Sequence, residues 1–145
     1  MRILVDGDAC PNREEISLIA KQYQVEMIVF VDYAHVIVSD DYQVVTCETG
    51  HDSVDMAVVN CTQAGDLVIT QDYGLAGLIL SKGAYVLHVS GQMINHDNID
   101  GLLMSRYMSA KERKKNHRVK GPAKRTETMK QLFLQQIENI IKGCQ

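Results

Sequence analysis

Aspartate residues recur in this sequence where an apolar segment has just ended. Asp6 and Asp8 follow the run RILV, and Asp72 follows the run LVIT after one intervening glutamine. Asp55 lies near the start of a helix-like segment that comes after another apolar stretch. Crowded carboxylates repel one another unless protons or cations neutralise them, and oxygen ligands of this kind suit Mg²⁺ or Mn²⁺. The pattern leads to the hypothesis of a divalent-cation site formed by these four aspartates.

Segments from distant parts of the chain must meet to build such a site. Strand-like stretches at 2–6, 25–31, 33–38, 43–47, 67–71 and 84–89 alternate with helix-like stretches at 11–23, 52–64, 73–82 and 99–108, and a helix over 126–143 closes the chain. Alternation of this kind predicts a mainly parallel sheet covered on both faces, a three-layer α/β/α fold. Sites in open sheets of this class form beyond the carboxyl ends of the strands, where all four aspartates are expected.

Charge is divided unequally along the chain. Residues 1–110 contain five Lys/Arg and fifteen Asp/Glu, whereas residues 111–145 contain ten Lys/Arg and three Asp/Glu. A dense basic stretch beside an acidic site indicates an anionic partner, for which we expect a nucleic acid. The residues expected to contact the phosphates of a nucleic acid are Lys114, Lys115, Arg118, Lys120, Lys124 and Arg125.

Several classes of protein are excluded or disfavoured by the composition. The sequence lacks an apolar run of 18 residues, so we expect no helix that spans a membrane. The N-terminus lacks the pattern of a secretory leader, and the four cysteines are scattered, so a cytoplasmic protein with reduced thiols is expected. The phosphate loop of nucleotide-binding enzymes and the Gly-rich dinucleotide motif are both absent from the sequence.

Each of the candidate residues also has a purely structural interpretation. Asp6-Gly7-Asp8 suits a simple turn after a strand, while Asp55 and Asp72 suit the capping of helix N-termini. Cys10 precedes a helix and is interpreted as a small packed thiol rather than an activated one. The functional hypothesis therefore depends on the joint placement of the four aspartates.

Four stretches of the sequence together are similar to one family. They are DGDACP after the first strand, HDSVDMAVVN, GDLVITQDYGLA and KGPAKRT near the end. Their combination resembles the YaiI/YqxD family of uncharacterised bacterial proteins over essentially the whole chain. That family is grouped with the PIN-like domains, many of which are metal-dependent ribonucleases.

The resemblance implies a PIN-like α/β domain over residues 1–110. Residues 111–145 would add a basic segment and a C-terminal helix packed on the same domain. In PIN-like domains an aspartate ends the first strand, an acidic residue lies in a central helix, and a T-x-D element follows a later strand. These features correspond here to Asp6, Asp55 and Thr70-Gln71-Asp72, with Asp8 as an additional acid.

The residues and the resemblance together predict a ribonuclease that hydrolyses RNA phosphodiesters with Mg²⁺ or Mn²⁺. Its catalytic and metal-binding residues would be Asp6, Asp8, Asp55 and Asp72. Two alternatives stay open, and one of them, a non-catalytic RNA-binding module, means that the sequence does not decide whether the protein is an enzyme. The other is a haloacid-dehalogenase-like phosphatase with Asp6 as nucleophile and Asp8 as acid/base. The oligomeric state is also left open.

Overall fold

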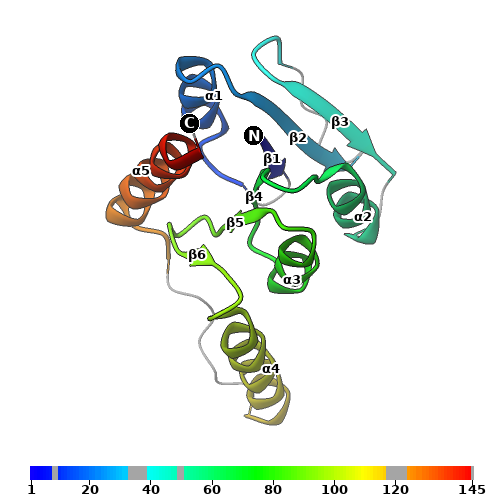
Figure 1. Ribbon diagram of the computed structural model, residues 1–145. Helices are drawn as coiled ribbons and strands as arrows, with labels where there is room; N and C mark the ends of the chain where they lie inside the picture. Colours follow the sequence, from blue (N-terminus) through cyan, green and yellow to red (C-terminus); the bar gives the residue numbers. More distant parts are fainter. Residues whose placement is uncertain (8–9, 33–38, 49–50, 117–123, 145) are drawn as a thin grey trace.

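Among the residues that the structure describes, six strands form one sheet with helices on both of its faces in this computed structural model (Figure 1). Residues 1–7, 10–32, 39–48, 51–116 and 124–144 are described, and for 51, 52, 113–116 and 144 only the backbone is. The strands are β1 (Arg2–Asp6), β2 (Glu26–Asp32), β3 (Gln43–Cys47), β4 (Leu67–Ile69), β5 (Tyr85–Leu87) and β6 (Met93–Ile94). The helices are α1 (Arg13–Gln22), α2 (His51–Cys61), α3 (Tyr73–Ser81), α4 (Ile99–Asn116) and α5 (Glu127–Cys144).

The order of strands places β1 inside the sheet, between β2 and β4. The order is β3-β2-β1-β4-β5-β6, with parallel pairing throughout except for the antiparallel pair of β5 and β6. The chain thus builds outward from β1 to β3 and then returns through α2 to start β4 on the other side of β1. The predicted three-layer α/β class with a mainly parallel sheet is confirmed. In open sheets of this class such a reversal is the place where ligands bind, here at the carboxyl ends of β1 and β4, and we call this place the crevice.

Alternation of side chains along the strands divides the core into two halves. Ile3 and Val5 of β1 face α1 and α5, whereas Leu4 faces α2 and α3. Period-two alternation therefore directs Asp6 and Thr70, which follow Leu4 and Val68 at this spacing, to the face that α2 and α3 cover.

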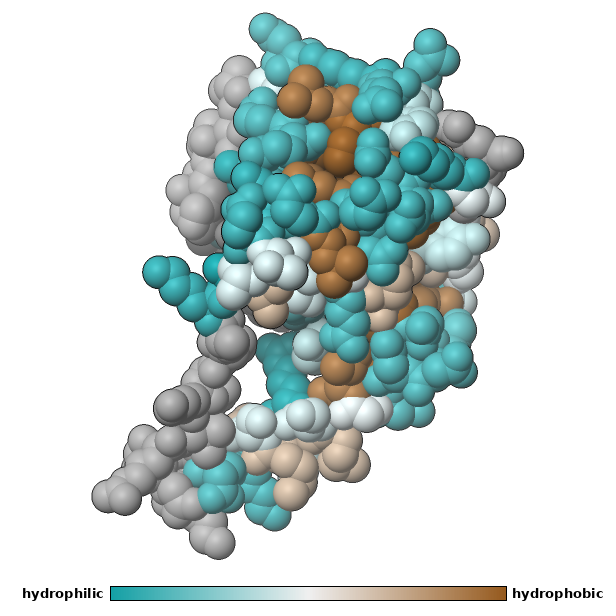
Figure 2. Space-filling model, turned by 90° about the vertical axis from the view of Figure 1, so that its left-hand side faces the viewer, coloured by the Kyte–Doolittle hydropathy of each residue, from teal (hydrophilic) through white to brown (hydrophobic). Residues whose placement is uncertain are grey.

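The C-terminal helix completes the first half of the core. α5 packs beside α1 and buries Phe133, Ile137 and Ile141, which are spaced four residues apart and so form one stripe of the helix. Figure 2 looks at this side of the molecule and shows apolar atoms gathered in a band between hydrophilic side chains. The burial of three side chains on α5 makes this helix part of the same core as the sheet.

Some elements differ from the predicted ones. α4 continues to Asn116 rather than ending at residue 108, because the alanine, lysine, arginine and glutamate residues that follow are good helix formers. β6 was not expected, since two residues give no periodic signal. The strand expected over 33–38 lies outside the described residues. Within the described helices, none combines the length and the apolar character that a membrane crossing requires.

Candidate functional site

At the carboxyl ends of β1 and β4, a chain of hydrogen bonds joins two of the predicted aspartates. The hydroxyl of Thr70, the residue after β4, donates to Oδ2 of Asp6 at 3.1 Å. The backbone N–H of Asp72 in turn donates to the same Thr70 oxygen at 3.0 Å. Asp6 is only 9% exposed and Thr70 only 1%, so this junction is shielded from solvent. Asp6 and Asp72 are thus tied to one hydroxyl group.

Gly7, the residue after Asp6, lies in close contact with β2, and this contact fixes the position of Asp6. The N–H of Gly7 donates to the Phe30 carbonyl at 2.8 Å, which extends the pairing of β1 with β2 by one residue. A Cβ atom at Gly7 would lie 2.6 Å from Cγ1 of Val29 and 2.8 Å from Cγ1 of Val31. A side chain at this position would force β2 or the loop to move, so packing requires the glycine between the two aspartates.

Asp72 is the N-cap of α3, as its structural interpretation predicts. Its Oδ1 accepts hydrogen bonds from the N–H groups of Gly74 at 2.8 Å and Leu75 at 3.2 Å. The guanidinium of Arg106 in α4 lies 3.5 Å from the same oxygen. Capping fixes the orientation of the carboxylate at the crevice, and a carboxylate has lone pairs enough to serve a further ligand.

The other two predicted aspartates contribute differently. Asp55 is half-buried near the start of α2, on the sheet face to which Asp6 also points, while Asp8 lies outside the described residues. Among the described residues, no three His, Cys, Asp or Glu side chains stand close enough to hold a metal ion. Asp6, Asp55 and Asp72 therefore do not form a closed metal cage.

The donor set at the crevice nevertheless fits Mg²⁺ or Mn²⁺. These are hard cations that prefer oxygen ligands, and Mg²⁺ is usually held by one or two carboxylates together with waters and substrate phosphates. Asp6 and Asp72 would be the residues that hold such an ion. A closed protein cage is not needed for this mode of binding.

Two arginine side chains, from α1 and from the residues just before α5, bind the loops at this edge of the sheet. Arg13, at the start of α1, donates from Nη1 to the Gly7 carbonyl at 2.9 Å. Arg125 donates from Nε to the Val89 carbonyl at 3.1 Å and from Nη1 to Oδ1 of Asn12 at 2.6 Å. These cations offset the negative charge of the loop that carries the aspartates.

Arg125 is held inside the fold rather than displayed on its surface. Its guanidinium carbon lies 5.3 Å from the ring centroid of Phe133, within the range of a cation–π contact. Its Nη2 atom is buried and has no hydrogen-bond partner in the described part of the chain. Arg125 thus anchors the start of α5 to the sheet while one of its donors still lacks an acceptor.

The other basic residues of the prediction lie at the end of α4 and in the sequence between α4 and α5. Lys124 is exposed, while Arg118 and Lys120 lie outside the described residues. Only the backbone is described at Lys114 and Lys115, in the last turn of α4.

Cys10 and His88 lie near the crevice without the character of reactive groups. Burial raises the pKa of the Cys10 thiol to about 12, with the charge of Asp6 adding to the effect and Arg13 and Arg125 opposing it. Burial also lowers the pKa of His88, whose Nδ1 lies 2.8 Å from Oγ of Ser90. The interpretation of Cys10 as a packed thiol is confirmed.

Sequence reasoning missed Arg13 and Arg106 as residues of this edge. Arg13 had a usable signal, since it stands at the start of the helix that follows the DGDACP loop. Arg106 had none, because its approach to Asp72 depends on how α4 packs along α3.

Comparison with known proteins shows the family to which this chain is similar. The family model described as "Uncharacterized BCR, YaiI/YqxD family" matches residues 4–143. A "UPF0178 protein" of Natranaerobius thermophilus is 43% identical over 141 residues, which cover 97% of this chain and 96% of that protein. A "UPF0178 protein" of Clostridium tetani is 46% identical over 127 residues, covering 88% of this chain and 87% of the relative. No solved structure matches the chain. This chain belongs to the YaiI/YqxD family.

Proposed function

We propose that this protein hydrolyses RNA phosphodiesters with a divalent cation, Mg²⁺ or Mn²⁺, at the crevice between β1 and β4. The observation that carries the proposal is the hydrogen-bonded junction of Asp6, Thr70 and Asp72 at the point where the sheet reverses its direction of construction. The Asp6 carboxylate at this junction and the Asp72 carboxylate that caps α3 provide hard oxygen ligands at the place where open sheets of this class bind their ligands.

The side chains of the chain divide the work of the proposed reaction. Asp6 and Asp72 bind the cation, and Thr70 keeps the Asp6 carboxylate directed into the crevice. When bound, a divalent cation supplies a Lewis acid that polarises a phosphoryl oxygen. Arg13 and Arg106 lie at the same edge and hold the phosphate charge of the substrate.

The reaction consumes one water for each phosphodiester. The water oxygen bonds to phosphorus, the bond from phosphorus to the bridging ribose oxygen breaks, and that oxygen leaves with a proton. Asp8, which lies outside the described residues, and Asp55 on α2 are proposed as further carboxylates of this site.

The test is cleavage of labelled RNA by the purified full chain, with Mn²⁺ and with EDTA. We expect cleavage only with the metal, and its loss in Asp6→Asn. The matched control is Asp97→Asn, because Asp97 is an exposed aspartate in the turn before α4. Cleavage by Asp6→Asn at the wild-type rate would overturn the proposal.

Other outcomes of the same experiment identify the alternatives. RNA retained in a salt-sensitive manner without any cleavage would indicate a binding module. Release of phosphate from a small phosphomonoester, with an aspartyl-phosphate trapped at Asp6, would indicate the phosphatase instead.

A further inference from the structure

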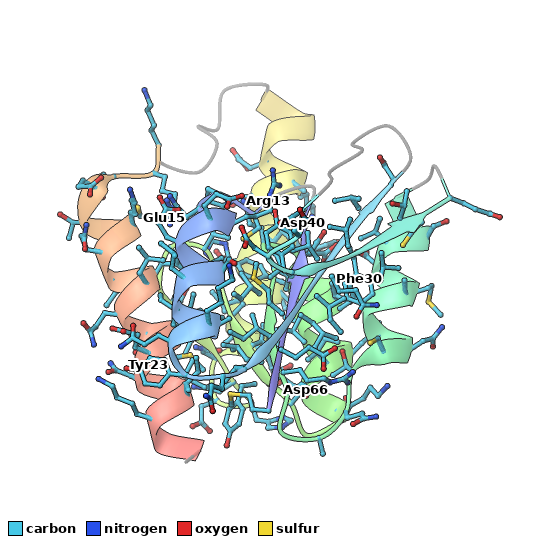
Figure 3. All side chains as sticks on the ribbon, turned by 90° about the horizontal axis from the view of Figure 1, so that it is seen from above. Arg13, Glu15, Tyr23, Phe30, Asp40 and Asp66 are labelled. Carbon is cyan, nitrogen blue, oxygen red and sulfur yellow. The ribbon has the colours of Figure 1, made fainter. Side chains whose placement is uncertain are left out.

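Because of the direction in which α4 packs on α3, the second half of α4 extends beyond the crevice. Ile99, the first residue of α4, lies against Gly77 in the middle of α3, while Arg106 reaches Asp72 at the N-terminus of α3. The two helices therefore run in opposite directions, and α4 advances toward the edge of the sheet where β4 ends. The residues after Arg106 add roughly 15 Å of helix at 1.5 Å per residue. Figure 3 shows the last turns of α4 rising past the edge at which Arg13 lies.

One face of α4 exposes apolar side chains at helical spacing. We call it the α4 stripe, and it consists of Leu103, Met104, Tyr107 and Met108, followed on the same face by the cation Lys111. All five are exposed, with Tyr107 at 62%, whereas Ile99 and Leu102 pack against the core. Apolar (tan) atoms are visible at the lower end of Figure 2, where α4 lies. An exposed apolar stripe that continues past the body of the protein indicates a surface for a partner.

The charge of α4 favours an anionic partner over a second copy of the chain. Five Lys/Arg and two Asp/Glu lie between Ile99 and Asn116 in the sequence. Pairing of two α4 helices through their own stripes would bring these positive charges together, and repulsion would oppose it. An anionic polymer with flat apolar groups could pair its charges with these cations and stack a flat group on the exposed ring of Tyr107.

RNA in single-stranded form has both properties. Bases stack on aromatic side chains while cations follow the phosphates, and this mode tolerates any sequence. A duplex hides the faces of its bases, so the Tyr107 ring would gain little from it. Arg106 precedes Tyr107 and is bound to Asp72, which links the stripe directly to the crevice.

We propose that the α4 stripe binds a single-stranded stretch of the RNA whose phosphodiester is hydrolysed at the crevice, with Tyr107 stacking on a base. This inference rests on the proposed function for the identity of the substrate. It adds a specificity for unpaired RNA and a binding surface that the basic segment alone would not provide.

Fluorescence anisotropy with labelled oligouridine, in EDTA so that no cleavage intervenes, tests the inference. We expect Tyr107→Ala to weaken binding by about tenfold, and Tyr107→Phe, which keeps the ring, to bind as the wild type does. The matched control is Tyr85→Ala, since Tyr85 is also exposed but lies at the start of β5, at the opposite edge of the sheet. A duplex of equal length should bind more weakly than the single strand.

Three results would overturn the inference. They are unchanged affinity of Tyr107→Ala, equal or tighter binding of the duplex, and a wild-type dimer that Tyr107→Ala converts to monomer. The proposed function can fail separately. Wild-type protein that binds oligouridine through Tyr107 but cleaves no RNA with Mn²⁺ would support the α4 stripe as a binding surface and overturn the nuclease proposal. Metal-dependent cleavage by the wild type, together with unchanged RNA binding by Tyr107→Ala, would support the nuclease proposal and overturn the role of the α4 stripe.

Discussion

The Thr70 hydroxyl donates to the Asp6 carboxylate at 3.1 Å, across the two central strands between which the sheet reverses its order. Thr70 also accepts the N–H of Asp72, so a single side chain links the end of β1 to the start of α3. The T-x-D element, Thr70-Gln71-Asp72, therefore has a physical role in this fold. Thr70 orients the Asp6 carboxylate, and the Asp72 carboxylate caps α3.

Replacing Thr70 by valine should remove this link while keeping the shape of the side chain. We expect metal-dependent RNA cleavage to fall by about tenfold or more, because Asp6 loses a donor that holds it in place. Stability should fall by about 1–2 kcal/mol, measured by urea unfolding, since the Asp72 N–H loses its acceptor.

Thr62→Val provides the matched control. Thr62 is also buried and donates to the Val58 carbonyl at 2.7 Å, but it lies just after α2, near the start of β4 rather than its carboxyl end. It should lower stability to a similar extent and leave the rate of cleavage unchanged. Wild-type cleavage by Thr70→Val would show that the link has no role in activity.

Gly7→Ala should disturb the loop that carries the first aspartates. The added Cβ would lie 2.6 Å from Cγ1 of Val29 and 2.9 Å from the Phe30 carbonyl oxygen, so β2 or the loop must move. We expect a loss of about 1–3 kcal/mol in the free energy of unfolding, together with weaker cleavage.

Gly101→Ala is the comparison for that change. Nothing lies within 4 Å of a Cβ at Gly101, which is in α4, so alanine should be neutral or stabilise by up to about 1 kcal/mol. If Gly7→Ala unfolded at the same urea concentration as the wild type, the proposed close contact of this loop with β2 would be wrong.

The ion pair at the other edge of the sheet should make stability depend on pH. Nη2 of Arg2 lies 2.7 Å from Oδ2 of Asp66. Burial of Asp66 opposes its ionisation, but the hydrogen bonds from Arg2 and from the Gln63 backbone outweigh it and hold the pKa below its ordinary value. A lowered pKa stabilises the fold above the ordinary pKa of aspartate, about 4, and this contribution disappears as the pH falls further.

Asp66→Asn should therefore cost about 3 kcal/mol at pH 7 and much less at pH 3. Urea unfolding at the two pH values measures the difference. The control is Asp41→Asn, which removes an exposed pair with Lys21 and should change stability by less than about 1 kcal/mol. An equal loss for Asp66→Asn at both pH values would contradict the assignment.

Arg125→Met should separate the structural role of this residue from its expected contact with RNA. Methionine keeps much of the apolar stem but loses the hydrogen bonds to Asn12 and Val89, so we expect stability to fall by about 2 kcal/mol. Hydrogen exchange should become faster in the first turns of α5. Lys124→Met, a change at an exposed neighbour, should weaken RNA binding and leave hydrogen exchange unchanged. Unaltered exchange in Arg125→Met would contradict the role of Arg125 as an anchor.

The sequence was sufficient for the class of fold and for the neighbourhood of Asp6 and Asp72. Strand–helix alternation predicts a parallel sheet, and two carboxylates placed after strands must then share an edge. Arg106 could not be found in this way, because the packing of α4 on α3 follows from three-dimensional contacts that have no local signal. The length of α4 was underestimated because its apolar periodicity fades, while helix propensity continues.

The central claim is that Asp6 and Asp72 share a divalent cation, and crystals soaked in Mn²⁺ test it most directly. Anomalous scattering at the manganese edge locates the ion without reference to activity. We predict a peak at the carboxyl ends of β1 and β4, within coordination distance of both carboxylates, that is absent in crystals of Asp6→Asn. Wild-type crystals without such a peak, from protein that cleaves RNA in the same Mn²⁺ concentration, would contradict the account.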